Sequence, residues 1–137
     1  MITITFKPNP LRASQLRDKP ERFFLNWNIS SRPHLWRPPT DLIELEDRFV
    51  VRIEIAGMRE DDFAVTLDQN LLIVQGVRPD LSERRAYHQM EINFGEFLST
   101  VEIPGRVDIE AIAAEYLSGF LLITLPFRKP HHIQISE

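Results

Sequence analysis

The fold is decided by one stretch, Ala114-Glu115-Tyr116-Leu117-Ser118-Gly119-Phe120-Leu121-Leu122-Ile123-Thr124-Leu125-Pro126. Residues 112–116 are apolar at every second position, which predicts a short strand with one buried face. Ser118-Gly119 follows as a turn, since glycine adopts conformations that other residues avoid. The apolar run from Phe120 to Leu125 predicts a second strand, which Pro126 ends because proline has no N–H to donate. The stretch is therefore interpreted as strand, turn and strand.

The same pattern of short apolar runs extends upstream as far as Asp41. Short alternating runs are separated by turn residues about every 8–12 positions, which is typical of an all-β sandwich or barrel. We expect further strands at Leu42–Leu45, Phe49–Ile55, Phe63–Asp68, Leu71–Gln75 and Phe97–Ile103. With a strand-like segment at Tyr87–Ile92, the total is about eight, enough for a sandwich.

The Tyr87–Ile92 segment has no partner close to it in sequence. It lies in a long interval between Gly76 and Phe97 in which the alternation lapses. A connection of this length in a compact domain is uncommon unless it has a task of its own. A strand without a local partner is a candidate for pairing with the exposed sheet edge of another chain.

Residues 1–40 differ in character from the rest of the chain. They contain six of the ten prolines, which prevents a long uninterrupted helix or strand there. Large apolar side chains nevertheless gather between these prolines, at Phe23, Phe24, Leu25, Trp27, Ile29, Leu35 and Trp36. A group of large apolar side chains is normally buried against another surface. The segment is either a short amphipathic helix docked on its own domain or an interaction segment for other subunits and clients, and the sequence leaves both open.

Charge and composition narrow the class of protein. The net charge is −4, yet residues 1–40 hold seven Lys or Arg against two Asp or Glu, so the arm is basic and the body acidic. The cations of the arm are scattered, and the acidic body would repel phosphate, so we expect no nucleic-acid partner. No cysteine, no signal-peptide pattern and no long apolar run occur, so we expect one cytoplasmic domain without integral membrane association.

Two motifs together resemble the small heat shock protein family, which carries the Hsp20 or α-crystallin domain. Ala114–Leu121 is similar to the family pattern of Ala, three variable residues, a polar turn residue, Gly, an apolar residue and Leu. Ile133-Gln134-Ile135 is similar to its terminal Ile-x-Ile/Val motif, with both isoleucines on one side of an extended chain. Further elements in family order are Trp36–Asp41, Ala56-Gly57-Met58, Tyr87–Ile92 and Phe97–Pro104.

The resemblance implies an immunoglobulin-like antiparallel β-sandwich with three parts. An N-terminal arm at 1–40 would contact clients and other subunits, an α-crystallin domain would span 41–126, and a C-terminal tail would occupy 127–137. The implied function is that of an ATP-independent chaperone, a holdase without cofactor, which keeps unfolding proteins from aggregating under stress and works as a dynamic oligomer of dimers.

The resemblance also implies which residues make each contact. The dimer would form by a strand swap, in which Tyr87, His88, Gln89 and Met90 pair with the edge strand of a neighbour at Leu42, Ile43 and Leu45. Larger assemblies would form when Ile133 and Ile135 fill a groove on another dimer, lined by Val65, Leu67, Ile112 and Ala114. Clients would be bound by Phe23, Phe24, Leu25 and Trp27.

One departure from the family pattern concerns the strand that follows the long loop. Members of the family usually carry an arginine two positions after its phenylalanine, where it joins ion pairing at the dimer interface. Here that position is Ser99, and Arg84 and Arg85 are the candidates to supply the missing charge. The dimer contact is therefore expected to be built differently.

Other classes of function have little support in the sequence. None of the four histidines has the spacing of an HExxH zinc site, and no phosphate-cradling or nucleophile motif occurs, so we expect no catalytic or metal site. Glu60-Asp61-Asp62 is interpreted as a solvated turn rather than a calcium site. The alternative is a monomeric co-chaperone similar to the p23/CS type, although that type lacks both the tail plug and the swapped strand. A sugar-binding module would carry exposed aromatic residues in the sandwich, whereas both tryptophans lie in the arm.

Overall fold

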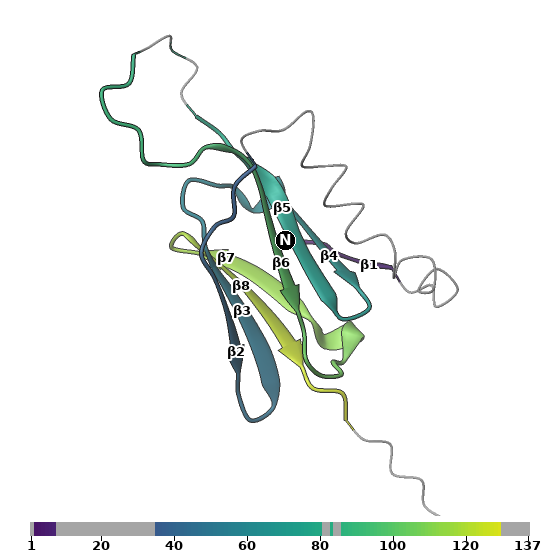
Figure 1. Cartoon of the computed structure of the whole chain (residues 1–137). Coiled ribbons are helices and arrows are strands. Elements are labelled where there is room, and N and C mark those ends of the chain that lie inside the picture. The colour runs from purple at the N-terminus through teal and green to yellow at the C-terminus, as the bar shows by residue number, and fades with distance from the viewer. Residues whose placement is uncertain (1, 8–34, 81–82, 84–85, 130–137) are drawn as a thin grey trace, which may run out of the picture.

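Alternating apolar residues build a sandwich of two sheets packed face to face (Figure 1). The computed structural model describes residues 2–7, 35–80, 83 and 86–129. The first sheet has the strand order β1-β4-β5-β6, and the second has the order β2-β3-β8-β7. All pairings between the named strands are antiparallel except that of β1 with β4, which is parallel. The antiparallel β-sandwich predicted from the sequence is confirmed.

The strands of the first sheet are β1 (Ile4–Lys7), β4 (Phe63–Asp68), β5 (Leu71–Arg78) and β6 (Gly95–Glu102). Those of the second sheet are β2 (Thr40–Glu44), β3 (Arg48–Glu54), β7 (Ala113–Leu117) and β8 (Phe120–Pro126). Two short 3₁₀ turns, η1 (Glu60–Asp62) and η2 (Ile109–Ala111), precede β4 and β7.

The β7–β8 hairpin has the turn that its sequence predicts. Ser118 and Gly119 have φ values of 53° and 82°, and they join Leu117 directly to its partner Phe120. Positive φ at both central residues gives the turn a twist that matches that of the flanking strands. On β8, Leu121, Ile123 and Leu125 are then buried between the sheets. These side chains face the buried residues of β4, β5 and β6 across one core.

Two segments depart from the expected strand list. Residues 86–94 contain no strand, so Tyr87–Ile92 does not form the expected strand in the single chain. In its place Ile4–Lys7, inside the segment expected to be an arm, forms β1 beside β4. The signal was the alternation of Ile2, Ile4 and Phe6, which is short and is followed by Pro8. The count of about eight strands is thus met by a different set.

The segment before β2 ties the two sheets together on one open side of the sandwich. The Trp36 N–H donates to Glu96 O at 3.2 Å, and the Leu98 N–H donates to Trp36 O at 3.0 Å, so Trp36 extends the first sheet beyond β6. Three residues later, Pro39 O accepts from the Glu54 N–H of β3, in the second sheet, at 3.0 Å. The Arg78 guanidinium lies 4.5 Å from the centre of the Trp36 ring, which adds a cation–π contact.

Ser99 lies inside this junction rather than on a surface. It is fully buried, and its hydroxyl is 2.7 Å from that of Thr40. Thr40 Oγ1 donates to Pro38 O at 2.9 Å, and a hydroxyl has one hydrogen, so the proton between the two side chains belongs to Ser99. In this chain the position that carries arginine in the family therefore holds a link between β6 and β2. Arg84 and Arg85 lie outside the described residues.

The Thr40–Ser99 contact predicts a specific pattern of stability losses. Thr40→Val leaves the buried Ser99 hydroxyl without an acceptor, which costs about 1–3 kcal/mol, whereas Ser99→Ala removes one neutral hydrogen bond at about 0.5–1.5 kcal/mol. The double variant should lose less than the sum of the two, because neither group is then left unsatisfied. Urea unfolding at fixed protein concentration measures all three, with Thr40→Ser as the control that keeps the hydroxyl. Strictly additive losses would contradict the contact.

Candidate assembly sites

The four residues predicted to line a groove lie close together. Val65 and Leu67, on β4, belong to the buried core cluster. Ile112, just before β7, and Ala114, on β7, pack against that cluster. β7 is an edge of the second sheet, and β4 would be an edge of the first without β1. These residues therefore line the second open side of the sandwich, opposite the junction at Trp36–Thr40.

The N-terminal strand occupies this open side. The register places Ile4 beside Val65 and Phe6 beside Leu67. Ile2 is only 8% exposed and belongs to the core cluster, and Ile4 and Phe6 pack against it. The intervening Thr3 and Thr5 are exposed, so β1 has one apolar and one polar face. This occupant was not predicted from the sequence.

Tyr116 fixes β7 at the rim of the same side. Its ring packs on Phe63 of β4, with ring centroids 5.1 Å apart. Its hydroxyl donates to Ile55 O at 2.8 Å and accepts from the Met58 N–H at 3.3 Å. A half-buried phenol with both bonds satisfied fixes the ring that packs across to the first sheet. The position of the predicted groove is thus defined by contacts that span both sheets.

The predicted dimer residues lie on an open sheet edge and on a projecting loop. β2 is the outermost strand of its sheet, and Leu42 and Leu45 are 40% and 39% exposed. The loop between β5 and β6 extends away from both sheets (Figure 1). Within it Tyr87, Met90 and Ile92 are among the exposed large hydrophobic residues. Both predicted partners in the strand swap are therefore accessible in the single chain.

Arg78 anchors the base of this loop. Its Nε donates to Asn93 O at 2.9 Å, its Nη2 donates to the same carbonyl, and its Nη1 donates to Ala56 O at 3.5 Å. Phe94 adds a cation–π contact at 5.3 Å. One side chain at the end of β5 thus holds the point at which the loop returns to the sheet. The sequence pattern alone gives no indication of this role.

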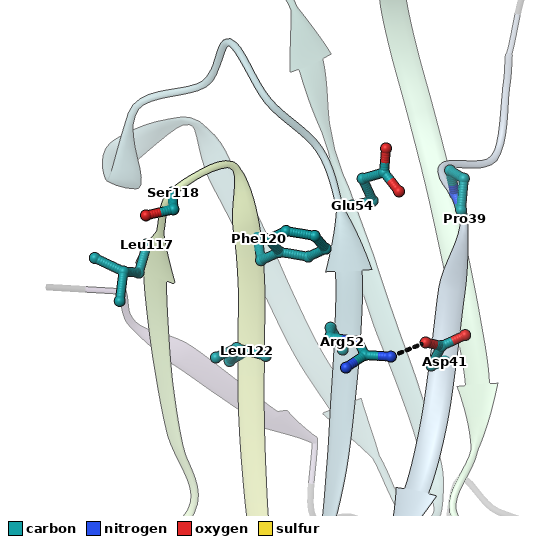
Figure 2. A pocket seen from close by; sticks show the side chains of 8 residues that line it. All are labelled: Pro39, Asp41, Arg52, Glu54, Leu117, Ser118, Phe120 and Leu122. Atoms are coloured by element: carbon teal, nitrogen blue, oxygen red, sulfur yellow. Dashed lines mark hydrogen bonds and ion pairs between the residues drawn. The ribbon is translucent and has the colours of Figure 1, made fainter.

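A shallow hollow on the outer face of the second sheet is a further surface that sequence analysis missed. Figure 2 shows its lining, which joins apolar side chains of the β7–β8 hairpin to charged side chains of β2 and β3. Leu117 is 64% exposed and Phe120 39% exposed. On the other side of the hollow, Arg52 donates to Asp41 at 2.5 Å. The hollow presents apolar and charged groups next to each other.

Several predicted functional residues lie outside the described residues. These are the client-binding Phe23, Phe24, Leu25 and Trp27 and the tail residues Ile133 and Ile135. Within residues 2–7, 35–80, 83 and 86–129, no three His, Cys, Asp or Glu side chains are grouped so that they could hold a metal ion. In the same part of the chain, no helix is long and apolar enough to span a membrane.

This chain is similar to known proteins in both sequence and fold. The sequence model of the Hsp20/alpha crystallin family matches residues 41–136. Small heat shock protein C4 of Rickettsia felis is 30% identical over 72% of this chain and 64% of its own length, so the chain spans less than two thirds of that relative. Heat shock protein 16.0 of Schizosaccharomyces pombe has a solved structure with a TM-score of 0.60 and 28% identity, covering 74% of this chain and 97% of that one.

A second solved structure, a small heat-shock protein from Xylella fastidiosa, gives a TM-score of 0.63 at 27% identity, covering 74% of this chain and 98% of that one. The family match extends over most of the chain, and both structures share the sandwich described above. The chain belongs to the Hsp20/alpha crystallin family of small heat shock proteins.

Proposed function

We propose that this protein is an ATP-independent holdase that works in the cytoplasm as an oligomer of dimers. The observation that carries the proposal is the exposed Tyr87–Met90 segment, which forms no strand in the single chain, together with the open edge at β2, in a chain of a chaperone family. Exposed apolar residues next to an open sheet edge are a liability in a monomer. They have a use in a protein that pairs with copies of itself.

The first level of assembly is a dimer formed by strand exchange. The Tyr87–Met90 segment of one subunit adds to β2 of the other, beside Leu42, Ile43 and Leu45. Main-chain hydrogen bonds provide the affinity, and alternate side chains provide the register. A twofold arrangement makes the contact twice, because each subunit both donates and accepts a strand.

The second level joins dimers through the C-terminal tails. Ile133 and Ile135 of one subunit fill the groove between β4 and β7 of another. Burying each isoleucine contributes roughly 1.5–3 kcal/mol before ordering is subtracted, so a single tail binds weakly. Several tails in one assembly act together through effective concentration. The result is an oligomer that is populated and still exchanges subunits. For a family member from Xylella fastidiosa, the solved structure is described as showing a distinct high order structure.

The third element is client capture by the arm. A protein that begins to unfold exposes apolar surface, and Phe23, Phe24, Leu25 and Trp27 cover such surface without stereospecific contacts. Subunit exchange exposes these residues, so no nucleotide is needed. In this proposal residues 1–40, 41–126 and 127–137 act as arm, domain and tail, and β1 and Trp36–Thr40 are the parts of the arm that pack on the domain.

Proline substitution in the loop tests the dimer. Successive N–H groups of a strand point to opposite sides, so either His88→Pro or Gln89→Pro must remove a ladder donor. The single chain has no strand there, so its own fold is unaffected. We expect at least one variant to become monomeric in light scattering at concentrations where the wild type is dimeric or larger, with His88→Ala and Gln89→Ala as controls. Assembly that withstands both prolines would reject the strand swap.

Removal of the tail isoleucines tests the second level. Replacing both Ile133 and Ile135 by Ala removes most of the buried area of the plug, and we expect the assembly to shrink to dimers in size-exclusion chromatography with light scattering. Gln134→Ala is the matched control, because residue 134 points away from the groove in an extended tail. An unchanged mass would refute the groove assignment. A wild-type protein that is monomeric at all concentrations would favour the p23/CS-type alternative.

Holdase activity is tested with heat-labile client enzymes without ATP. We expect the wild type to suppress light scattering by the heated client, and we expect a variant with Phe23, Phe24 and Trp27 changed to Ser to lose most of this protection. A variant with Ser30 and Ser31 changed to Ala is a control within the same arm. Lack of protection by the wild type across several clients would count against the proposal.

A further inference from the structure

We infer that the N-terminal Ile2-Thr3-Ile4 segment is a second ligand of the β4–β7 groove and competes there with the C-terminal tail. This inference rests on the proposed docking of the tail and adds a mechanism that limits it. The groove that the tail of a neighbour would fill is filled in the single chain by its own N-terminus. Assembly through tails then requires β1 to leave.

The first support is the place that β1 occupies. Its register runs from Ile4 beside Val65 to Lys7 beside Asp68, along the edge of β4 that the tail would use. The outer edge of a strand offers one row of N–H and C=O groups, so it can pair with one partner strand at a time. Occupation by β1 and occupation by a strand-like tail therefore exclude each other along these residues.

The second support is the shared pattern of the two chain ends. Ile2-Thr3-Ile4 and Ile133-Gln134-Ile135 both place isoleucines on either side of one polar residue. In β1 this spacing has the effect expected of the tail, because Ile2 is buried, Ile4 packs against the core, and Thr3 is exposed. Phe6 adds a third inward side chain beside Leu67. The N-terminal segment therefore presents to this open side the face that the tail is expected to present.

The third support is that β1 lies at the margin of the sheet. It touches the first sheet through β4 alone, whereas β4 and β5 each have a strand on both sides. Its removal leaves the order β4-β5-β6 and the whole second sheet intact. Terminal segments of this kind open at lower free energy than central strands. The segment is thus placed to leave the groove without unfolding the domain.

Competition has a measurable effect on tail affinity. A ligand that binds only the open form is weakened in proportion to the fraction of chains that are open. Because β1 is covalently attached, it competes at a fixed effective concentration, whereas tails of other subunits compete in proportion to protein concentration. Low concentration would then favour the closed form and high concentration the assembled form.

The first test measures tail binding directly on the full chain. A fluorescent peptide of residues 127–137 is titrated against the variant that carries Ile133→Ala and Ile135→Ala, so that no internal tail competes. Adding Ile2→Ser and Ile4→Ser should tighten peptide binding roughly tenfold in fluorescence anisotropy, as expected for a groove that is mostly closed. Thr3→Ser with Thr5→Ser is the matched control on the exposed face and should leave the affinity unchanged. Equal affinity with and without the two N-terminal isoleucines would overturn the inference.

The second test locks β1 in place and does not depend on removing core side chains. Thr5 and Thr66 are direct neighbours in the β1–β4 register, and the chain contains no cysteine of its own. Neighbouring strands lie about 4.8 Å apart, within the range that a disulfide bridges. In the variant Thr5→Cys/Thr66→Cys, oxidation should give an intramolecular disulfide and reduce the assembly to dimers, and reduction should restore the larger mass. Thr66→Cys alone is the control for oxidation.

The outcomes separate the inference from the proposed function. If the wild type and the reduced double-cysteine variant assemble through their tails but the oxidised variant assembles equally well, competition is overturned and the proposed assembly stands. Failure of the disulfide to form would also overturn the inference, because β1 would then not lie beside β4 in solution. If the tail peptide binds neither variant of the first test, tail docking itself is refuted, and competition with it.

Discussion

The edges of the two sheets set the constraint on which the rest of this structure depends. A β-sandwich buries its inner faces well, but each sheet ends in strands whose outer backbone groups and apolar side chains need a cover. In this protein the two open sides are covered by different means. Trp36–Thr40 crosses from β6 to β3 on one side, and β1 pairs with the outer edge of β4 and packs against the core on the other.

What lies outside these two closures is the surface available for association. β2 remains an open edge, and the β5–β6 loop carries Tyr87, Met90 and Ile92 away from the sheets. Membership of the small heat shock protein family gives these features a shared interpretation, since the proposed dimer uses both. By the same reasoning, the proposed tail contact at the β4–β7 side is weaker than the proposed dimer contact, because β1 of the same chain already lies beside β4.

The fold was largely predictable because its strands are specified locally. Alternation in Phe49–Ile55 and the Ser118-Gly119 turn depend on neighbours in sequence, and both appear as expected. The closures were not predictable in this way. Thr40 meets Ser99 across 59 positions, and β1 meets β4 across a longer interval, so only the assembled sheets bring these partners together. The groove residues Val65, Leu67, Ile112 and Ala114 came from the family resemblance. In the structure the first two belong to the buried core and the last two pack against it, and β1 lies beside the first two.

The junction at Thr40 and Ser99 differs from the family arrangement in one physical respect. Two hydroxyl groups carry no charge, so the bond between them neither titrates nor is screened by dissolved ions. The exposed Asp41–Arg52 ion pair, on the neighbouring residue of β2, is weakened by dissolved ions. A rise in ionic strength would therefore weaken the ion pair on the outer face of this strand, while the hydroxyl bond that attaches its inner face to β6 persists.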